Sequence, residues 1–233
     1  MKRFYKEVTV GEAEGGNWRV ALDGRAIKTA GGRAQVVPTR ALAEALAAEW
    51  EAQGDTIDTA LFRYRDLVDF AIDAVMPGRE AVIAELLPYA ETDTLCYRAD
   101  PDEPLFKRQQ DLWEPLLTRA EAQYGVTFTR VSGIIHRPQS EATLAALRAT
   151  LDTRDDFTLA ALRMLSSLAA SLVIALAAVA PGADAHALWK AANLEEDWQV
   201  ELWGEDWEAA ERRAARLEAF TLAMRLAGLV RGH

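Results

Sequence analysis

The sequence is poor in the residues that most often build reactive or metal-binding sites. It has one cysteine, Cys96, and three histidines, His136, His186 and His233, among 233 residues. A single cysteine excludes an internal disulfide, which suits a reducing compartment. The histidines stand in none of the spacings that zinc or di-metal sites use. Only Arg98 lies close enough along the chain to activate the Cys96 thiol, so a buried structural thiol is the favoured interpretation.

The common nucleotide-binding and nucleophile motifs are also missing. No GxxxxGK loop and no GxGxxG occur, and the serines of the most apolar stretch lie in no GxSxG elbow. Gly31-Gly32 is followed by a predicted strand and not by a helix, so we interpret this pair as a turn. We therefore expect no enzymatic activity, no catalytic residue, no cofactor and no metal.

Long apolar segments are absent as well. The longest runs from Leu168 to Ala180, which is too short for a bilayer span of about 20 residues, so we expect a buried helix there. The first ten residues, MKRFYKEVTV, contain no continuous apolar segment of the kind found in secretory signals. We expect a protein of a bacterial cytoplasm, or of the mitochondrial matrix if the chain is organellar, without a membrane partner.

Positive charge is scarce. The chain carries 26 Lys and Arg against 36 Asp and Glu, a formal net charge of −10. Phosphates would be repelled by such a surface on average, which argues against a general nucleic-acid binder. A charged partner should be basic where it touches this protein. Half of the residues are hydrophobic, so a sizeable core is expected.

Residues 3–37 predict a small antiparallel sheet. Trp18, Val20 and Leu22 alternate with polar positions before Asp23-Gly24, which is a strong hairpin signal. We expect a return strand over residues 26–29 and a further strand over residues 34–37. A helix packed on one face of this sheet would complete the N-terminal part.

The rest of the chain is mostly helical in pattern. Thr39 is the predicted N-cap of a first helix that ends at Gly54. Further helices are expected over residues 65–75, ended by Pro77-Gly78, and over residues 105–124, 141–151, 159–180 and 185–193. Residues 126–135 fit either a strand or an extended crossing. The fold class is α+β: a small N-terminal antiparallel β-sheet domain with packed helices, residues 1–76, then a larger all-α helical domain, residues 77–233.

The most unusual stretch is LEEDWQVELWGEDWEAAERR, residues 194–213. Three tryptophans, Trp198, Trp203 and Trp207, lie among acidic residues, and no basic residue occurs between Lys190 and Arg212. If the stretch is helical throughout, its apolar side chains occupy two neighbouring faces. Three interpretations are open. The stretch can be a core-packing helix with a solvated acidic face, or a recognition surface in which aromatics and carboxylates anchor a partner. It can also bind a divalent cation through its carboxylates.

Short motifs in a fixed order run along nearly the whole chain. They are Arg3-Phe4-Tyr5-Lys6, Leu22-Asp23-Gly24-Arg25, Lys28-Thr29, Val37-Pro38-Thr39, Glu49-Trp50, Ala71-Ile72-Asp73, Thr92-Asp93-Thr94-Leu95-Cys96-Tyr97-Arg98, Trp113-Glu114-Pro115-Leu116, Glu195-Glu196 with Gln199, and Trp203-Gly204. In this order the sequence resembles the assembly chaperones of F-type ATP synthase, the assembly factor twelve family of mitochondria and α-proteobacteria.

The resemblance implies a non-enzymatic chaperone with an N-terminal α+β domain and a larger helical domain. Members of that family hold the unassembled α subunit of the soluble catalytic head until the β subunit replaces them. The implied partner is therefore the ATP synthase α subunit, with no nucleic acid, membrane or small-molecule substrate. The α-proteobacterial branch of the family is the one we expect.

Two groups of residues follow from the motifs. We predict that the partner-binding residues are Glu195, Glu196, Gln199, Trp203, Gly204 and Glu205. We predict structural roles for Asp23 and Arg25, in turn formation and surface ion pairs, and for Asp93 and Arg98, in tying the two domains together. Two rival functions stay open: an acidic metal-assisted hydrolase around Glu195–Glu205, and a general holdase or scaffold without a specific client.

Overall fold

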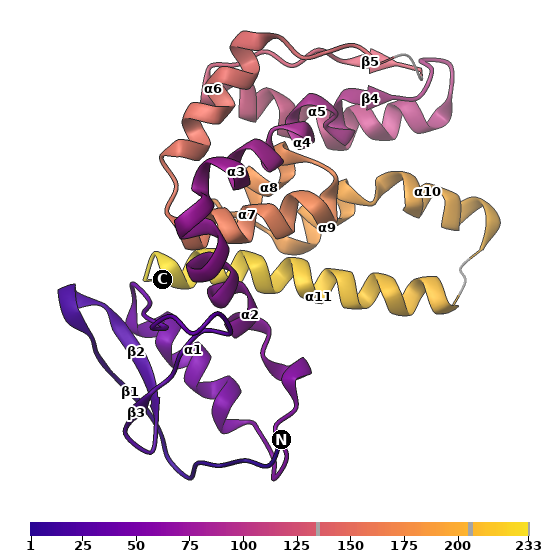
Figure 1. Ribbon diagram of the computed structural model, residues 1–233. Coiled ribbons are helices and arrows are strands. Elements are labelled where there is room, and N and C mark those ends of the chain that lie inside the picture. The colour runs from indigo at the N-terminus through magenta and orange to yellow at the C-terminus, as the bar shows by residue number, and fades with distance from the viewer. Residues whose placement is uncertain (134–135, 205–206, 233) are drawn as a thin grey trace. The chain divides into compact units, whose positions relative to one another are not determined.

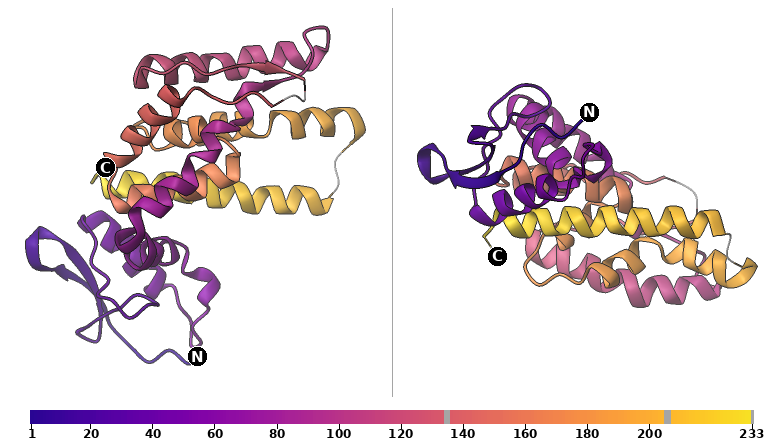
Figure 2. Two further views of the ribbon diagram at one scale, coloured as in Figure 1. Left: turned by 45° about the horizontal axis from the view of Figure 1, so that its top comes forward. Right: turned by 90° about the horizontal axis from the view of Figure 1, so that it is seen from below.

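The computed structural model describes residues 1–133, 136–204 and 207–232 (Figure 1, with two further views in Figure 2). The chain divides into two compact units. The first consists of Met1–Arg79, Asp155–Ala161 and Arg225–His233, and the second of Glu80–Arg154 and Leu162–Met224. The predicted domain ranges, 1–76 and 77–233, remain a prediction. None of the helices in the described ranges is both long and apolar enough to span a bilayer.

A three-stranded antiparallel sheet opens the first unit, as predicted. Its strands β1 (Val8–Glu12), β2 (Trp18–Leu22) and β3 (Arg25–Ala26) are neighbours in chain order, and a 3₁₀ turn, η1 (Glu14–Gly16), joins the first two. Asp23 and Gly24 both have positive φ angles, 48° and 76°, as a type I′ hairpin turn requires. The predicted hairpin is confirmed.

The strand predicted over residues 34–37 does not form among the described residues, and the return strand ends at Ala26. Residues 34 and 37 make only isolated bridges to Lys28 and Trp18. The loop before residue 34 is held by carboxylates instead, because the backbone N–H of Ala30 donates to Asp69 and that of Gly31 to Asp73. Carboxylates from a later helix thus hold the backbone groups that a regular ladder would need.

Helix α1 (Arg40–Glu51) packs against β1 and β2 (Figure 1). The Thr39 hydroxyl accepts a hydrogen bond from the N–H of Leu42 at 3.2 Å, which confirms the predicted N-cap. The predicted end at Gly54 was wrong, because the helix stops at Glu51 with Ala52 as a right-handed C-cap. A 3₁₀ turn, η2 (Thr59–Leu61), leads to the next helix.

The second helical segment continues past its predicted stop. Helix α2 (Arg63–Phe70) runs through a π turn, η3 (Ala71–Val75), into α3 (Met76–Leu86), which contains both Pro77 and Gly78. A proline removes one helical donor and frees carbonyls in the preceding turn. Here the Arg33 guanidinium donates to the carbonyl of Ile72 at 2.7 Å. A long-range partner therefore compensates for the break that Pro77 predicts.

The second unit is mainly helical. Its elements are α4 (Pro88–Glu91), η4 (Thr94–Cys96), β4 (Tyr97–Arg98), α5 (Pro104–Tyr124), β5 (Val131–Ser132), α6 (Glu141–Asp152), α8 (Leu172–Ala178), α9 (Ala185–Ala192), α10 (Leu194–Trp203) and most of α7 (Asp156–Ala169) and α11 (Trp207–Val230). Gly125, at φ 65°, ends α5, and the Ser140 hydroxyl caps α6, both as predicted. Part of the open stretch 126–135 is the strand β5, which pairs in parallel with β4.

The single apolar helix predicted over residues 159–180 is two helices, α7 and α8. Ala170 has a φ of 48°, and the Ser171 hydroxyl caps α8 by accepting from Ile174 at 3.0 Å. The carbonyl of Ala170 accepts the N–H of Thr94 at 3.1 Å. The break is thus stabilised by a segment distant in sequence, which helical periodicity does not register. The predicted fold class, α+β with a small N-terminal sheet and a larger helical part, is confirmed.

Candidate functional site: the Trp203 face of helix α10

Helix α10 is shorter than the stretch that defined it in the sequence. It ends at Trp203, because Gly204 takes a φ of 89°, a conformation that side chains with a Cβ rarely adopt. Helix α11 begins at Trp207, so Trp203 and Trp207 do not share one continuous helix. The stretch is therefore not one continuous helix, which was the condition for its two neighbouring apolar faces. Glu205, one of the predicted partner-binding residues, lies outside the described residues.

The acids of α10 fall into two groups, and the first is bound within the protein. Glu195 accepts a hydrogen bond from the fully buried Gln109 of α5 at 2.8 Å. Glu201 pairs with Arg108, also of α5, at 2.7 Å, and Asp197 pairs with Arg213 of α11. These carboxylates hold α10 to its neighbours.

The same contacts set the ionisation of these acids. Partial burial raises the pKa of Glu195, and its hydrogen bond from Gln109 opposes that rise. The hydrogen bond from Arg108 lowers the pKa of Glu201. The Arg108 guanidinium also lies 4.4 Å from the ring centre of Trp198, which is half-buried. Arg108 and Arg213 therefore supply partners within the protein for Glu201, Asp197 and the ring of Trp198.

The remaining acid, Glu196, lies on a face here called the Trp203 face, which is made of the exposed Glu196, Gln199 and Trp203 and the half-buried Val200. Glu196, Gln199 and Trp203 stand at i, i+3 and i+7, which places them along one side of the helix. Trp203 is 81% exposed, and its indole N–H donates to the Gln199 side chain at 3.1 Å. Glu196 makes no hydrogen bond or ion pair through its side chain with any residue that the structure describes.

This arrangement suits binding of a polypeptide better than bond-making chemistry. A large indole held in solvent by a neighbouring amide offers apolar contact area at little cost in conformational entropy. The free carboxylate beside it can accept from a basic side chain or a backbone N–H. Over the described ranges, no three His, Cys, Asp or Glu side chains gather in a way that could hold a metal ion. Leu202 of α10 and Trp207 of α11 are also exposed, at 53% and 71%.

Glu196, Gln199 and Trp203 of the Trp203 face were predicted from the sequence, but the residues that bind the other acids of α10 were not. Arg108 and Gln109 lie on α5, and Arg213 lies on α11. No spacing along the chain links them to α10. Their effect is to leave Glu196 as the carboxylate on α10 that is exposed and has no described partner.

Asp23 lies in the hairpin turn of the first unit. Its carboxylate accepts from the backbone N–H groups of Lys6 at 3.0 Å and Glu7 at 2.9 Å, which lowers the pKa of Asp23. The turn is thereby tied to the segment before β1. Arg25 follows the turn, is exposed, and adds an attractive charge to Asp23.

Asp93 and Arg98 lie inside the second unit. The Asp93 carboxylate is fully buried and accepts from the N–H groups of Leu95 and Val173, both at 3.0 Å. The guanidinium of Arg98 pairs with Glu114 at 3.1 Å. These contacts join residues of the second unit to one another, and the interdomain role of Asp93 and Arg98 stays a prediction.

Cys96 is a buried thiol, as predicted. Burial, and secondarily the charge of Asp93, raises the pKa of Cys96 to about 12. A thiol with this pKa is protonated at neutral pH and is a poor nucleophile. It therefore contributes packing to the core.

Known proteins resemble this chain over its whole length. Residues 2–121 match the model of the ATP12 chaperone protein family. The crystal structure of Atp12 from Paracoccus denitrificans superposes with a TM-score of 0.93 at 36% sequence identity, covering 98% of each chain. A putative chaperone from Agrobacterium tumefaciens gives 0.92 at 39% identity, covering 97% of this chain and 85% of that one.

A more distant relative is the mitochondrial protein atp12 of Schizosaccharomyces pombe. It is 26% identical over 216 residues, which cover 88% of this chain and 74% of the relative. The family model, the relative and the solved structures agree with the resemblance carried by the motifs, and that prediction is confirmed. This chain belongs to the ATP12 chaperone family.

Proposed function

We propose that this protein is an assembly chaperone that holds the free α subunit of the F-type ATP synthase catalytic head until the β subunit replaces it. Membership of the ATP12 chaperone family supports a role in ATP synthase assembly. We place the Trp203 face at the contact with the α subunit, in a bacterial cytoplasm or, for an organellar chain, in the mitochondrial matrix. The protein acts by binding and without catalysis.

The observation that carries this proposal is the exposure of Trp203 on the same side of α10 as Glu196, a carboxylate without a described partner. Subunit surfaces that await assembly are large and apolar, and they aggregate unless they are covered. An exposed tryptophan is the side chain most often found at the energetic centre of protein interfaces. Trp203 is 81% exposed and is oriented by its bond to Gln199. Glu196 supplies a charge that selects a basic or backbone donor on the client.

The test is co-purification of the tagged chain with the ATP synthase α subunit, using Glu196→Lys. Glu196 is exposed and has no described side-chain partner, so the variant should keep its circular dichroism melt. We expect its affinity for the α subunit to fall about tenfold or more, the usual size of a charge reversal at an interface. Glu51→Lys makes the same charge change at the exposed end of α1 and should bind as the parent does. Equal loss in both variants would remove Glu196 from the interface.

A second pair of variants tests the indole. Trp203→Ala should weaken α-subunit binding by about 2 kcal/mol or more, the size of an interface hot spot. Trp207→Ala removes an indole of similar exposure, 71% against 81%, from α11. We expect a smaller loss there. If both variants lose the same affinity, exposed aromatic surface in general binds the client, and the specific role of the Trp203 face is refuted.

The rival functions predict other outcomes. A general holdase would capture a spread of unfolded proteins from a lysate, whereas we expect one dominant ATPase subunit. A metal-assisted hydrolase would be stabilised against heat by Mg²⁺ or Zn²⁺, whereas we expect no shift of the melting temperature. On α10, Glu195, Asp197 and Glu201 already have protein partners, which does not favour the metal site.

A further inference from the structure

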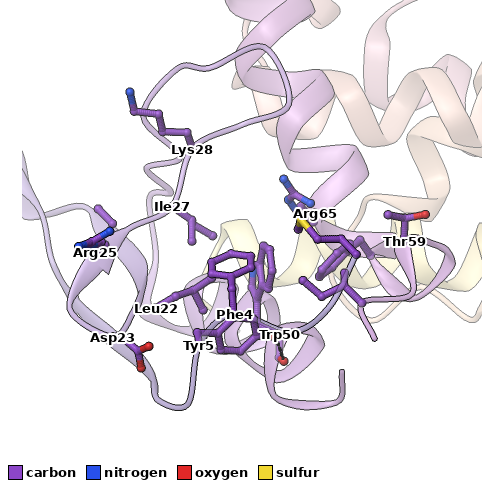
Figure 3. A pocket seen from close by; sticks show the side chains of 14 residues that line it. Phe4, Tyr5, Leu22, Asp23, Arg25, Ile27, Lys28, Trp50, Thr59 and Arg65 are labelled. Carbon is purple, nitrogen blue, oxygen red and sulfur yellow. Dashed lines mark hydrogen bonds between the residues drawn. The ribbon is translucent and has the colours of Figure 1, made fainter. Parts of the chain in front are cut away.

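A second candidate binding surface lies in the first unit, and its edge is basic where α10 is acidic. A pocket of about 640 Å³ opens between the N-terminal segment, the β2–β3 hairpin, α1 and the start of α2 (Figure 3). Its floor is apolar: Tyr5, Leu22, Ile27, Trp50 and Phe62 are each at most 9% exposed. A pocket with this floor can accept one aromatic or branched aliphatic side chain.

The edge of the pocket is basic, although the chain as a whole carries a net charge of −10. Arg25 and Lys28 lie on the strand side of the aromatic cluster and Arg65 on the helix side (Figure 3). Arg25 and Lys28 are exposed and form no side-chain hydrogen bond or ion pair with another described residue. The one acid in the lining, Asp23, has its carboxylate on two backbone N–H groups. The lining thus carries three cations against the one carboxylate of Asp23, which attracts Arg25, so the edge is basic on balance.

Two polar atoms of the lining lack acceptors. The indole nitrogen of Trp50 and the Nε of Arg65 are buried and have no hydrogen-bond partner among the described residues. Arg65 lies over the rings of Trp50 and Phe62, at 5.0 and 4.8 Å. Its Nε forms an ion pair with Asp69 at 3.6 Å, which is too long for a hydrogen bond, so a carboxylate of a ligand would share Arg65 with Asp69. Burying a donor without an acceptor is costly, at about 1–3 kcal/mol.

The apolar surface continues outside the floor. Phe4 and Met1 line the pocket and are 61% and 76% exposed. The ring of Phe4 lies edge-on to that of Tyr5 at 5.3 Å. Because positive charge lies on both sides of this apolar surface (Figure 3), its complement is a chain that carries acids both before and after an aromatic residue.

We propose that this pocket binds an acidic segment of a partner protein, with one aromatic side chain inserted onto the Trp50 and Ile27 floor. The carboxylates on either side of that anchor pair with Arg25 and Lys28 on the strand side and with Arg65 on the helix side. This site is independent of the α-subunit contact on α10: the segment bound here is acidic, whereas Glu196 calls for a basic or backbone donor. A polypeptide is the proposed occupant because the positive charges flank the floor instead of meeting at one point.

The test is isothermal titration calorimetry of the full chain with an acetylated, amidated peptide of sequence EEFEE. The matched peptide EEAEE lacks the anchor, and KKFKK reverses the charge. We expect EEFEE to bind about tenfold more tightly than EEAEE and KKFKK not to bind measurably. Binding of KKFKK, or equal binding of EEAEE, would overturn the proposal. Equal affinity for N-acetylphenylalanine would overturn it too, because the pocket would then take small aromatic acids.

Charge-reversal variants test whether the peptide binds at this pocket. Arg25→Glu and Lys28→Glu should each weaken EEFEE binding about fivefold. Arg19→Glu makes the same charge change at an exposed position of β2 outside the pocket lining and should change affinity less than about twofold. Because all three side chains are exposed, circular dichroism melts should match the parent. An equal loss with Arg19→Glu would show that only overall charge matters and would refute a site at this pocket.

Discussion

The Trp203 face and the pocket of the first unit use the same residue type in opposite ways. Trp203 is 81% exposed and lies beside a free carboxylate, whereas Trp50 is 5% exposed and lies beneath the guanidinium of Arg65. One indole is available to a partner and contributes little to folding. The other forms a floor on which the first unit itself depends. The comparison shows that aromatic content alone does not mark a binding surface; burial and neighbouring charge decide its role.

The two regions also differ in how they are built. The Trp203 face comes from one helical turn pattern, with residues at i, i+3 and i+7. The pocket gathers residues from the N-terminal segment, the hairpin, α1 and α2. A substitution on the helical face should therefore affect binding more than stability. A substitution in the pocket floor should affect stability first.

The largest effect on stability should come from Trp50→Ala, and Trp203→Ala is its matched comparison. Trp50→Ala removes a side chain packed against Tyr5 and Phe62, with ring centres at 5.5 and 4.5 Å. We expect it to lower the free energy of unfolding by about 3–5 kcal/mol. Trp203→Ala should change it by less than about 0.5 kcal/mol. Urea denaturation of both variants measures the difference, and a similar loss in both would erase the contrast.

A buried acid of the second unit offers a further contrast with the exposed acids of α10. Burial raises the pKa of Asp93 from 3.8 to about 6, against the opposing effect of its hydrogen bonds. The folded state then holds the proton more tightly than the unfolded state. The stabilising contribution of the protonated group is complete below the ordinary pKa and is lost as pH rises through about 6, a change of about 3 kcal/mol.

Asp93→Asn removes this titration. The stability advantage of the parent over the variant should therefore shrink as pH rises from about 4 to about 7. Urea denaturation at several pH values checks the direction. An advantage that grows with pH would mean that the bonds from Leu95 and Val173 outweigh burial, and that the pKa of Asp93 lies below its ordinary value.

The smallest of these effects separates two neighbouring acids of α10. Glu195→Ala leaves the side chain of the fully buried Gln109 without its acceptor, which should lower the free energy of unfolding by about 1–2 kcal/mol. Glu196→Ala should change it by less than about 0.5 kcal/mol. For the affinity of the folded protein for the α subunit we expect the reverse: Glu196→Ala should lower it more than Glu195→Ala does. Thermal melts and co-purification of both variants together test this division between support and contact.

Local signals explain what could be predicted from the sequence. The Asp23-Gly24 hairpin, the Thr39 and Ser140 caps and the Gly125 stop all involve groups within a few residues of one another. Two of the predictions that were wrong concern helices whose course depends on distant partners. The α7–α8 break is stabilised by Asp93, whose bond to Val173 spans 80 residues. The helix through Pro77 is supported by Arg33, which lies 39 residues before the carbonyl it binds.

For the candidate site, the sequence by itself determined the negative charge, the three tryptophans near residue 200, and the Glu196, Gln199 and Trp203 spacing. Helical geometry converts that spacing into one face without outside help. Only the tertiary structure decided which acids have partners inside the protein, through Arg108, Gln109 and Arg213, and that basic residues lie on two sides of an apolar floor in the first unit. The physical reason is that charge pairing and burial depend on distances in space between segments, and those distances are set by packing of the whole chain.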